Sequence, residues 1–448
     1  MKGILLLFAL FSFQVFAQDA VIAVGKAEQD KDKFVIDSPE QIDLSQDQKI
    51  MSMEFVEILR NNFVFYKHRF NVVDYQQKGQ NSFSQPNLSL WKSTGVTYFV
   101  ASKIQPSSSG IKVQLKVWNI LTEKLIGDYA EVLSKSMLRS KTHGLSNQIY
   151  RAITGKDSIF GSKIVFVSDR TSSSEKEIIK ELYVMDFDGR RVEKLTNFNS
   201  VVLSPSISPD NTKIMFSLIA TKNIVSNGKR KTFKNIDLKL LDLRNRSFKT
   251  LSDRPGINSG AIFSSKPGYI YLTLSFGGNA DIYEMNIETQ KLRKMTTHYG
   301  EDVDPSLTKD GTLMSFLSSR SGRAHIYTMN PDSTEGGLKR ISFVGQFNAT
   351  PRFSPDGKEI VFTSWVDNGF DLYRISSQGQ NLSRLTKDFG SNEEPQFSPD
   401  GEFIVFTSKR VLSRTRAVQD IYIMNRDGEI LGQLTQDFGR CFSPQWSN

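Results

Sequence analysis

The chain has 448 residues, of which 38% are hydrophobic and 23% are charged. This composition indicates a folded protein with ample apolar material for a core and excludes a disordered chain, and the length is typical of two domains. The formal net charge of +9 is modest for this length. It is compatible either with simple solubility or with an acidic partner or an anionic cell-wall polymer.

The first 17 residues have the features of a cleaved export signal. Lys2 supplies a positive charge, residues 4–16 are apolar but too short to span a bilayer comfortably, and Ala17 precedes Gln18, the expected mature N-terminus. The cleavage site carries no cysteine for lipidation, and no later apolar run is long enough for a transmembrane helix. We therefore expect a soluble, exported protein without a membrane span.

The exported part begins with a short polar segment, residues 18–33, that we expect to form an N-terminal arm. Residues 34–154 then show a mixed α/β pattern. Apolar residues have helical spacing in 46–63 and 137–153, and β-type runs occur at 70–74, 96–102 and 111–118. A polar, glycine-containing linker follows at 155–162. The sequence thus predicts an α+β multidomain protein, with a small N-terminal α/β domain joined to a second domain at residues 163–448.

The second domain is a repeated unit of four short β-type runs separated by turns. A Pro-Asp-Gly turn at 355–357 and 399–401 follows the first run, a third run carries Ile-Tyr or Leu-Tyr, and a Leu-Thr pair or near copy ends the unit. These units end 44 to 56 residues apart, which is typical of a β-propeller with four strands per blade. Their last residues are Thr196, Ser252, Thr296, Ser342, Thr386 and Thr435.

The two ends of the repeat predict how the propeller closes. The unit that begins at Lys163 has no first strand before it, whereas the run from Ser443 to Ser447 is a first strand without a second. We therefore expect the C-terminal strand to complete the first blade and close a six-bladed ring, which also removes an exposed sheet edge. The only cysteine, Cys441, is compatible with a reactive thiol or with a small buried residue beside this strand.

Three connections between second and third strands are long, at residues 171–180, 221–236 and 409–419. The last two carry clusters of Lys and Arg. In a meander, these basic loops lie on the face that also holds the blade-to-blade connections, and the tight Pro-Asp-Gly turns lie on the other face. Because loops on a rigid scaffold usually carry function, we expect the functional site at the channel mouth on the face with the long connections.

The sequence shows no signature of a catalytic or metal centre. Its 4 histidines are scattered, and nucleophile-elbow and phosphate-loop motifs are absent. The acidic stretch at 186–189 fits a tight turn better than a calcium loop, and the tyrosine that recurs in the third strands fits a core position. We therefore expect no catalysis, no metal and no cofactor, and nothing indicates nucleic-acid binding.

The polar connections that enter the first strands are more informative. In a propeller these segments converge on the channel mouth, so they form either a solvated rim or a docking surface for a folded partner or an extended segment. They include Asn258, Ser259, Gly260, Glu301, Asp302, Val303, Asp304, Asn348, Ala349, Thr350, Asn392, Glu393, Glu394 and Arg440.

Taken together, these features resemble the TolB family, the periplasmic β-propeller proteins of the Tol–Pal system. The resemblance rests on the export signal, the α/β domain, the repeats and the terminal Pro-Gln-Trp-Ser at 444–447, and it covers nearly the whole exported chain. Single repeats also occur in other propellers, whereas an architecture that ends at the closing strand is more specific. Residues 264–268, the long basic segment 221–236 and the sequence of the arm depart from the family pattern.

The resemblance implies a non-enzymatic, monomeric adaptor in the periplasm that supports outer-membrane integrity and constriction at cell division. It implies that the channel mouth binds the peptidoglycan-associated lipoprotein Pal and that the N-terminal arm binds TolA. Carried onto this chain, the Pal-facing residues are Asn258, Gly260, Val303, Asp304, Thr350, Glu393 and Glu394. The arm residues are Gln18, Asp19, Ala20, Val21 and Ile22.

Two alternatives from other classes stay open at this point. The same propeller could scaffold an exported hydrolase or lyase, which would need a second catalytic domain or histidines and carboxylates that converge on the channel. It could instead bind peptidoglycan or another cell-wall polysaccharide through the basic loops. Binding that weakens steeply with added salt would favour the polysaccharide.

Overall fold

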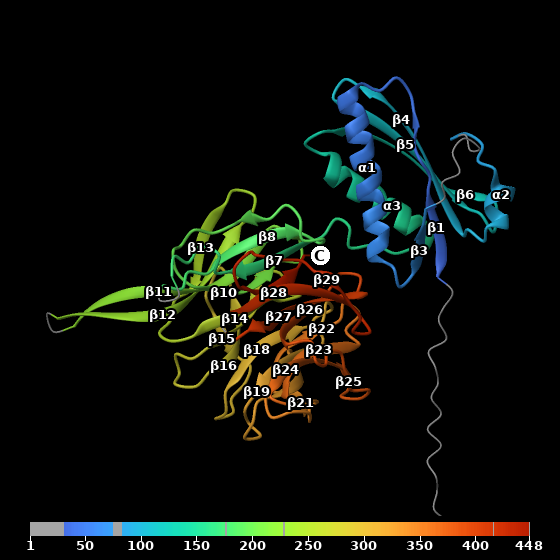
Figure 1. The fold of residues 1–448 in the computed structure, drawn as a ribbon. Helices are drawn as coiled ribbons and strands as arrows, with labels where there is room; N and C mark the ends of the chain where they lie inside the picture. Colours follow the sequence, from blue (N-terminus) through green and yellow to red (C-terminus); the bar gives the residue numbers. More distant parts are fainter. Residues whose placement is uncertain (1–30, 75–82, 175–176, 227–228, 415, 448) are drawn as a thin grey trace, which may run out of the picture.

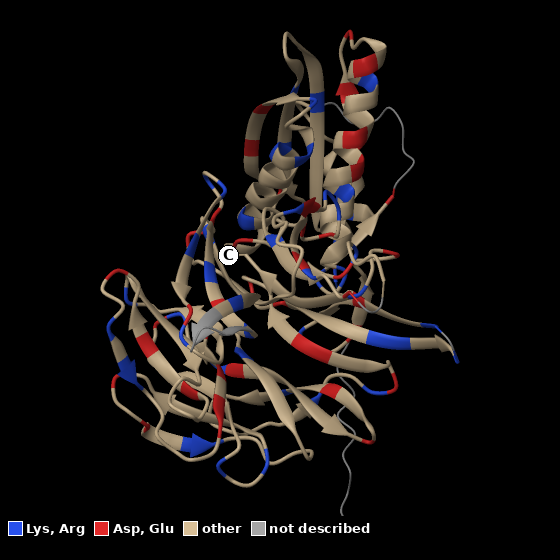
Figure 2. Cartoon of the chain, turned by 90° about the vertical axis from the view of Figure 1, so that its left-hand side faces the viewer, with Lys and Arg blue, Asp and Glu red and all other residues tan. Residues whose placement is uncertain are grey.

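The computed structural model describes residues 31–74, 83–174, 177–226, 229–414 and 416–447. An α/β domain stands on one side of a β-propeller in two perpendicular views (Figure 1 and Figure 2), and acidic and basic residues are interspersed over both domains. The expected signal peptide and most of the expected arm, including residues 18–22, lie outside the described residues. Within the described ranges, no helix is long and apolar enough to cross a membrane.

The α/β domain is built on one sheet of six strands in the order β3-β1-β4-β5-β6, with β2 paired to β4. Strand β1 is parallel to β3 and β4, whereas β4, β5 and β6 are antiparallel. The helices are α1 (Gln46–Phe65), α2 (Leu88–Ser93) and α3 (Leu138–Thr154). The strands are β1 (Asp32–Ile36), β2 (Glu40–Gln41), β3 (Phe70–Val73), β4 (Tyr98–Ser107), β5 (Gly110–Asn119) and β6 (Lys124–Ser134).

The two faces of this sheet follow from the alternation of side chains along its strands. Phe34 and Val100 belong to a core that includes buried residues of α1 and α3, whereas Val35 and Phe99 pack with Trp91 of α2. Helix α1 begins at a capping box in which Ser45 and Gln48 exchange hydrogen bonds. The predicted helices at 46–63 and 137–153 are confirmed as α1 and α3, while β1, β2, β6 and α2 were not predicted.

Six four-stranded sheets form the propeller. In blade one, β30 (Cys441–Trp446) pairs antiparallel with β7 (Lys163–Ser168), so the C-terminal strand closes the ring as the sequence predicts. Blade one also holds β8 (Glu181–Asp186) and β9 (Glu193–Lys194). Blade two holds β10 (Val202–Ile207), β11 (Lys213–Ser226), β12 (Lys229–Asp242) and β13 (Ser247–Ser252), and blade three holds β14 (Asn258–Phe263), β15 (Tyr269–Leu274), β16 (Asp281–Asn286) and β17 (Leu292–Lys294).

The remaining blades repeat the same meander. Blade four holds β18 (Asp302–Leu307), β19 (Met314–Ser318), β20 (His325–Asn330) and β21 (Gly336–Arg340). Blade five holds β22 (Asn348–Phe353), β23 (Glu359–Val366), β24 (Gly369–Ser376) and β25 (Ser383–Arg384). Blade six holds β26 (Ser391–Phe397), β27 (Phe403–Ser413), β28 (Arg416–Asn425) and β29 (Ile430–Gln433). The predicted fold, a six-bladed propeller that follows a small α/β domain, is therefore confirmed.

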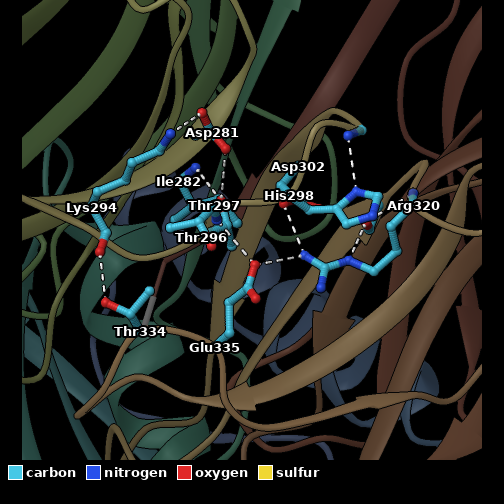
Figure 3. Close-up of polar contacts among 12 residues, drawn as sticks. Asp281, Ile282, Lys294, Thr296, Thr297, His298, Asp302, Arg320, Thr334 and Glu335 are labelled. Atoms are coloured by element: carbon cyan, nitrogen blue, oxygen red, sulfur yellow. Dashed lines mark hydrogen bonds and ion pairs between the residues drawn. The ribbon is translucent and has the colours of Figure 1, made fainter.

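The repeated Leu-Thr pair has a structural reason. In blade three the backbone N–H of Ile282 donates to Thr296 Oγ1 at 3.0 Å, and this hydroxyl donates to Asp281 Oδ1 at 3.4 Å (Figure 3). One side chain thus satisfies a buried N–H and a buried carboxylate together. The same arrangement recurs in blades one, five and six with Thr196, Thr386 and Thr435.

Two of the three long connections are not loops. Strands β11 and β12 pair continuously as far as Ser226↔Lys229, and β27 and β28 pair as far as Ser413↔Arg416. The expectation of basic loops at 221–236 and 409–419 was therefore wrong. These segments extend their strands as hairpins, because their backbone groups gain cross-strand partners. The β11–β12 hairpin projects away from the ring (Figure 1).

The α/β domain contacts the tight-turn face of the propeller at blades one and six. Tyr66 Oη donates to Asp400 Oδ2 at 2.6 Å, and Arg69 Nη2 donates to Glu402 Oε1 at 2.8 Å. On blade one, Arg139 of α3 pairs with two acidic residues, Asp186 and Asp188. Because the tight turns carry this domain, the face with the blade-to-blade connections is the one turned away from it.

Candidate partner-binding site at the channel mouth

The first strands of all six blades carry the same β-bulge. At each bulge the register against the second strand shifts, and the bulged residue has a φ between +47° and +59°. A bulge bends its strand and redirects a side chain, so the ring presents one equivalent residue from every blade. These residues are Ser204, Gly260, Asp304, Thr350, Glu394 and Ser443.

The backbone at this ring of bulges is strained, because only one of its six residues is glycine. Thr350, with a φ of +49°, is the least favourable case, since a Cβ-branched residue rarely adopts a positive φ. In five blades a proline follows the bulged residue, which also keeps that residue out of the right-handed helical region. Strain that recurs at one position around a ring is typical of a functional site.

The bulged residues line one central cavity of about 340 Å³. Five of the seven predicted Pal-facing residues meet there: Gly260, Val303, Asp304, Thr350 and Glu394. The sequence analysis missed several other lining residues, namely Ser204, Arg352, Ser443 and Gln445. Ser204 and Ser443 each precede a proline, as Asp304 and Glu394 do, so the shared register of the first strands was the signal that could have identified them.

The carboxylates of the cavity are fixed by neighbouring blades. Arg352 Nη2 of blade five donates to Asp304 Oδ1 of blade four at 2.9 Å. Glu394 of blade six accepts the backbone N–H of Ser443 at 2.6 Å, and the Ser443 hydroxyl donates to its other oxygen at 2.6 Å. These contacts hold both acidic groups in place beside the channel, where each carboxylate has further acceptor capacity for a ligand.

The other two predicted Pal-facing residues lie elsewhere. Asn258 is fully buried, accepts a hydrogen bond from Ser252 Oγ at 2.5 Å and donates to the Arg254 carbonyl at 2.7 Å, so its amide supports the fold. Glu393 is half-buried and does not line the cavity. Its burial, and then the adjacent Glu394, raise the pKa of its carboxyl to about 7.

Two further expectations concern the arm and metal binding. The arm residues Gln18, Asp19, Ala20, Val21 and Ile22 lie outside the described part of the chain. Across the described ranges, no group of three or more His, Cys, Asp or Glu side chains is arranged to hold a metal ion. The geometry of the site is therefore that of a polar, partly acidic channel mouth.

Comparison with known proteins places the chain in a family. Residues 150–448 match the family model described as the TolB beta propeller domain. The chain belongs to the TolB β-propeller family. A protein TolB homolog from Chlorobium luteolum is 28% identical over 244 residues, which are 54% of this chain and 51% of that protein. The Tol-Pal system protein TolB from Francisella tularensis subsp. mediasiatica is 26% identical over 278 residues, which are 61% of each chain.

The matched segments thus span between about half and three fifths of these curated relatives. The crystal structure of TolB from Acinetobacter baumannii is similar over more of the chain. It has a TM-score of 0.77 and 24% identity, and the match covers 94% of this chain and 97% of that one. The two structures are similar in both the α/β domain and the propeller. The resemblance drawn from the sequence is therefore confirmed at the level of family and fold.

Proposed function

We propose that this protein is a non-enzymatic adaptor of the Tol–Pal system that binds Pal at the channel mouth and TolA through its N-terminal arm. Export by the signal peptide at residues 1–17 places it in the periplasm, where it acts as a monomer in outer-membrane integrity and constriction at cell division. Membership in the TolB family and the similarity to a Tol-Pal system protein support this role.

The observation that carries the Pal assignment is the ring of bulges. One residue from each blade lines a single cavity, and each bulge lies near the start of its strand, away from the tight turns that carry the α/β domain. A folded partner can therefore approach the mouth without displacing that domain. The fixed carboxylates of Asp304 and Glu394 give such a partner charged acceptors whose positions are set before binding.

Calorimetric titration of the full chain with the soluble domain of Pal from the same organism tests this assignment. Asp304→Arg reverses one charge at the mouth, and Asp304→Asn removes the charge while keeping a residue that tolerates a positive φ. We expect both variants to weaken one-to-one binding at least about tenfold. The matched control is Glu288→Arg, at an exposed tight turn of blade three, which should bind Pal normally.

Absence of binding at roughly tens of micromolar would refute the Pal assignment. Binding that survives both Asp304 substitutions would instead refute the site and keep the partner. The arm is tested separately, because removal of residues 18–22 should abolish binding of TolA and leave the Pal titration unchanged. A truncated chain that still binds TolA would contradict the role of the arm.

A further inference from the structure

A second groove, separate from the channel, lies between blades one and six. We call it the arginine groove because four arginines line it: Arg170, Arg410, Arg416 and Arg440. Its volume is about 830 Å³, and it shares no lining residue with the channel cavity. The connection after β7, the β27–β28 hairpin and the segment before β30 form its walls.

Two of these arginines differ in their ion pairs from the arginine at the equivalent position of blade four. The position compared lies two residues after an equivalent serine of each second strand. It holds Arg170 in blade one, Arg320 in blade four and Arg410 in blade six. In blade four, Arg320 is paired with Asp302 at 2.9 Å and with Glu335 at 3.2 Å (Figure 3). Arg170 and Arg410 are exposed, and neither forms an ion pair with any residue that the structure describes.

The reason for this difference lies at the residue of the first strand that pairs with this serine. Blade four has Asp302 there, whereas blade six has Asn392 and blade one has Cys441. Blades one and six therefore lack the buried carboxylate that Arg320 approaches at this position of blade four. Each guanidinium stands instead over a phenylalanine ring of the blade-to-blade connection: Arg170 lies 4.3 Å from the Phe438 centroid and Arg410 lies 5.0 Å from the Phe389 centroid. Arg410 Nη1 also donates to Tyr422 Oη at 3.4 Å.

Stacking on these rings holds the two guanidinium groups outward without neutralising them. Blade four shows the contrast, because Tyr299, which corresponds to Phe389 and Phe438, is 87% exposed and its partner arginine turns inward to the acids. The other two arginines of the groove are paired with aspartates. Arg440 Nε lies 2.6 Å from Asp169, and Arg416 lies 3.7 Å from Asp437. Arg170 and Arg410 are thus the two arginines of the groove without an ion pair in the described structure, and the third acid that lines it, Asp420, is buried and accepts a hydrogen bond from Thr435 Oγ1.

The same groove exposes the edge of a strand. Five consecutive residues of β28, positions 416–420, line it. Because alternate residues of a strand point to opposite faces, consecutive lining residues mean that the edge and not a face borders the groove. Strand β29 pairs with β28 only from Tyr422 onward, so over 416–419 the outer edge of β28 has no partner strand in the described structure.

We propose that the arginine groove binds an extended, acidic peptide segment of a partner protein. The segment adds a strand to the edge of β28, and its carboxylates pair with Arg170 and Arg410. An acidic sugar fits the groove less well, because Tyr422, the one aromatic side chain among the described lining residues, is buried and offers no ring face for stacking. This site lies apart from the channel mouth, so the proposal does not depend on the binding of Pal.

Fluorescence polarisation of the full chain with a labelled peptide of about ten residues, alternating Glu and Thr, tests the proposal. We expect saturable binding that weakens at least about tenfold in the double variant Arg170→Glu/Arg410→Glu. The control is Arg323→Glu, an exposed arginine of the corresponding connection in blade four, which should leave binding unchanged. Melting curves of the variants show that they are folded, and Arg170→Gln/Arg410→Gln serves as a milder second pair.

Two further probes separate strand addition from attraction by charge. A peptide of the same sequence with alternate amides methylated keeps its carboxylates but loses the N–H groups that pair with β28, so it should bind at least about tenfold more weakly. A galacturonate oligomer of equal charge should also bind weakly. Equal binding of all three probes, or wild-type affinity in the double arginine variants, would overturn the proposal.

Discussion

Removing the charge of Glu393 and removing the charge of the adjacent Glu394 are expected to change the free energy of unfolding in opposite directions. The carboxyl of Glu393 is half-buried, makes no hydrogen bond that compensates its charge in the described structure, and has a pKa raised to about 7 by burial and by Glu394, against the opposing effect of Lys409. We therefore predict that Glu393→Gln stabilises the protein above neutral pH and changes little below pH 5.

The sign follows from proton linkage. Between the ordinary value of 4.5 and about 7, the native protein holds a proton on Glu393 that the unfolded chain has lost. The free energy of unfolding therefore falls as the pH rises through this window, and the loss is complete above it. The difference between the two pKa values corresponds to at most about 3 kcal/mol. Because solvent screens a half-buried group, we expect about half of this, roughly 1–2 kcal/mol.

The assay is urea unfolding of wild type and Glu393→Gln at pH 5 and pH 8, with the difference between the proteins compared at each pH. Other titrating groups cancel in this comparison. Glu394→Gln is the comparison variant, because Glu394 accepts two hydrogen bonds from Ser443, and their loss should destabilise the ring by about 2 kcal/mol at pH 5. At pH 8 the destabilisation should be smaller, because the substitution also removes the charge that raises the pKa of Glu393. Equal pH dependence in wild type and Glu393→Gln would refute the reasoning about burial.

Three further predictions concern buried polar groups at the contact between the domains and along the closing strand β30. Tyr66→Phe removes the donor to Asp400 and should lower the free energy of unfolding by about 1–3 kcal/mol, measured by urea unfolding. Cys441 is fully buried and its pKa is raised to about 12, so a thiol reagent at pH 8 should react only as fast as the chain unfolds. Trp446→Phe loses the indole donor to Ser162 Oγ and should lower the melting temperature by several degrees, roughly 4 °C, as calorimetry would show. Unchanged stability of either variant would contradict the importance of the hydrogen bond it removes, and labelling of Cys441 faster than unfolding would contradict its burial.

The sequence predicts the propeller well because each blade encodes its own contacts locally. The acid that heads a third strand and the Thr that ends the repeat unit recur together, since one hydroxyl bridges the carboxylate and a backbone N–H. Counting first strands then predicts the closure by β30. Strand β6 was missed because only Leu133 among its residues is buried, so it shows little apolar pattern. The charged hairpins were taken for loops because Lys and Arg are more frequent in exposed segments.

The site was predicted in part, and the bulges explain which part. Polarity selected Asn258 and Asp304 alike, although Asn258 begins its strand with a buried side chain and Asp304 lies at a bulge that faces the channel. A bulge breaks the two-residue alternation of side chains along a strand, so polarity alone does not distinguish positions that face the channel from positions that are buried. The sequence indicated only parts of the arginine groove, namely the basic segment 409–419 and Arg440, because the residues that line the groove are distant in the sequence.

The α/β domain and the closing strand meet in a single hydrophobic core. That core includes Phe63 of α1, Tyr150 of α3, Phe166 of blade one, Phe403 of blade six and Trp446 of the closing strand. The domain thus covers the seam where β30 pairs with β7, which is the place at which a propeller ring opens. Separating the domain from the ring would expose both the seam and these aromatic side chains, so the domain and the closure stabilise each other. The mouth lies on the opposite face, so the proposed binding of Pal there would leave the seam closed.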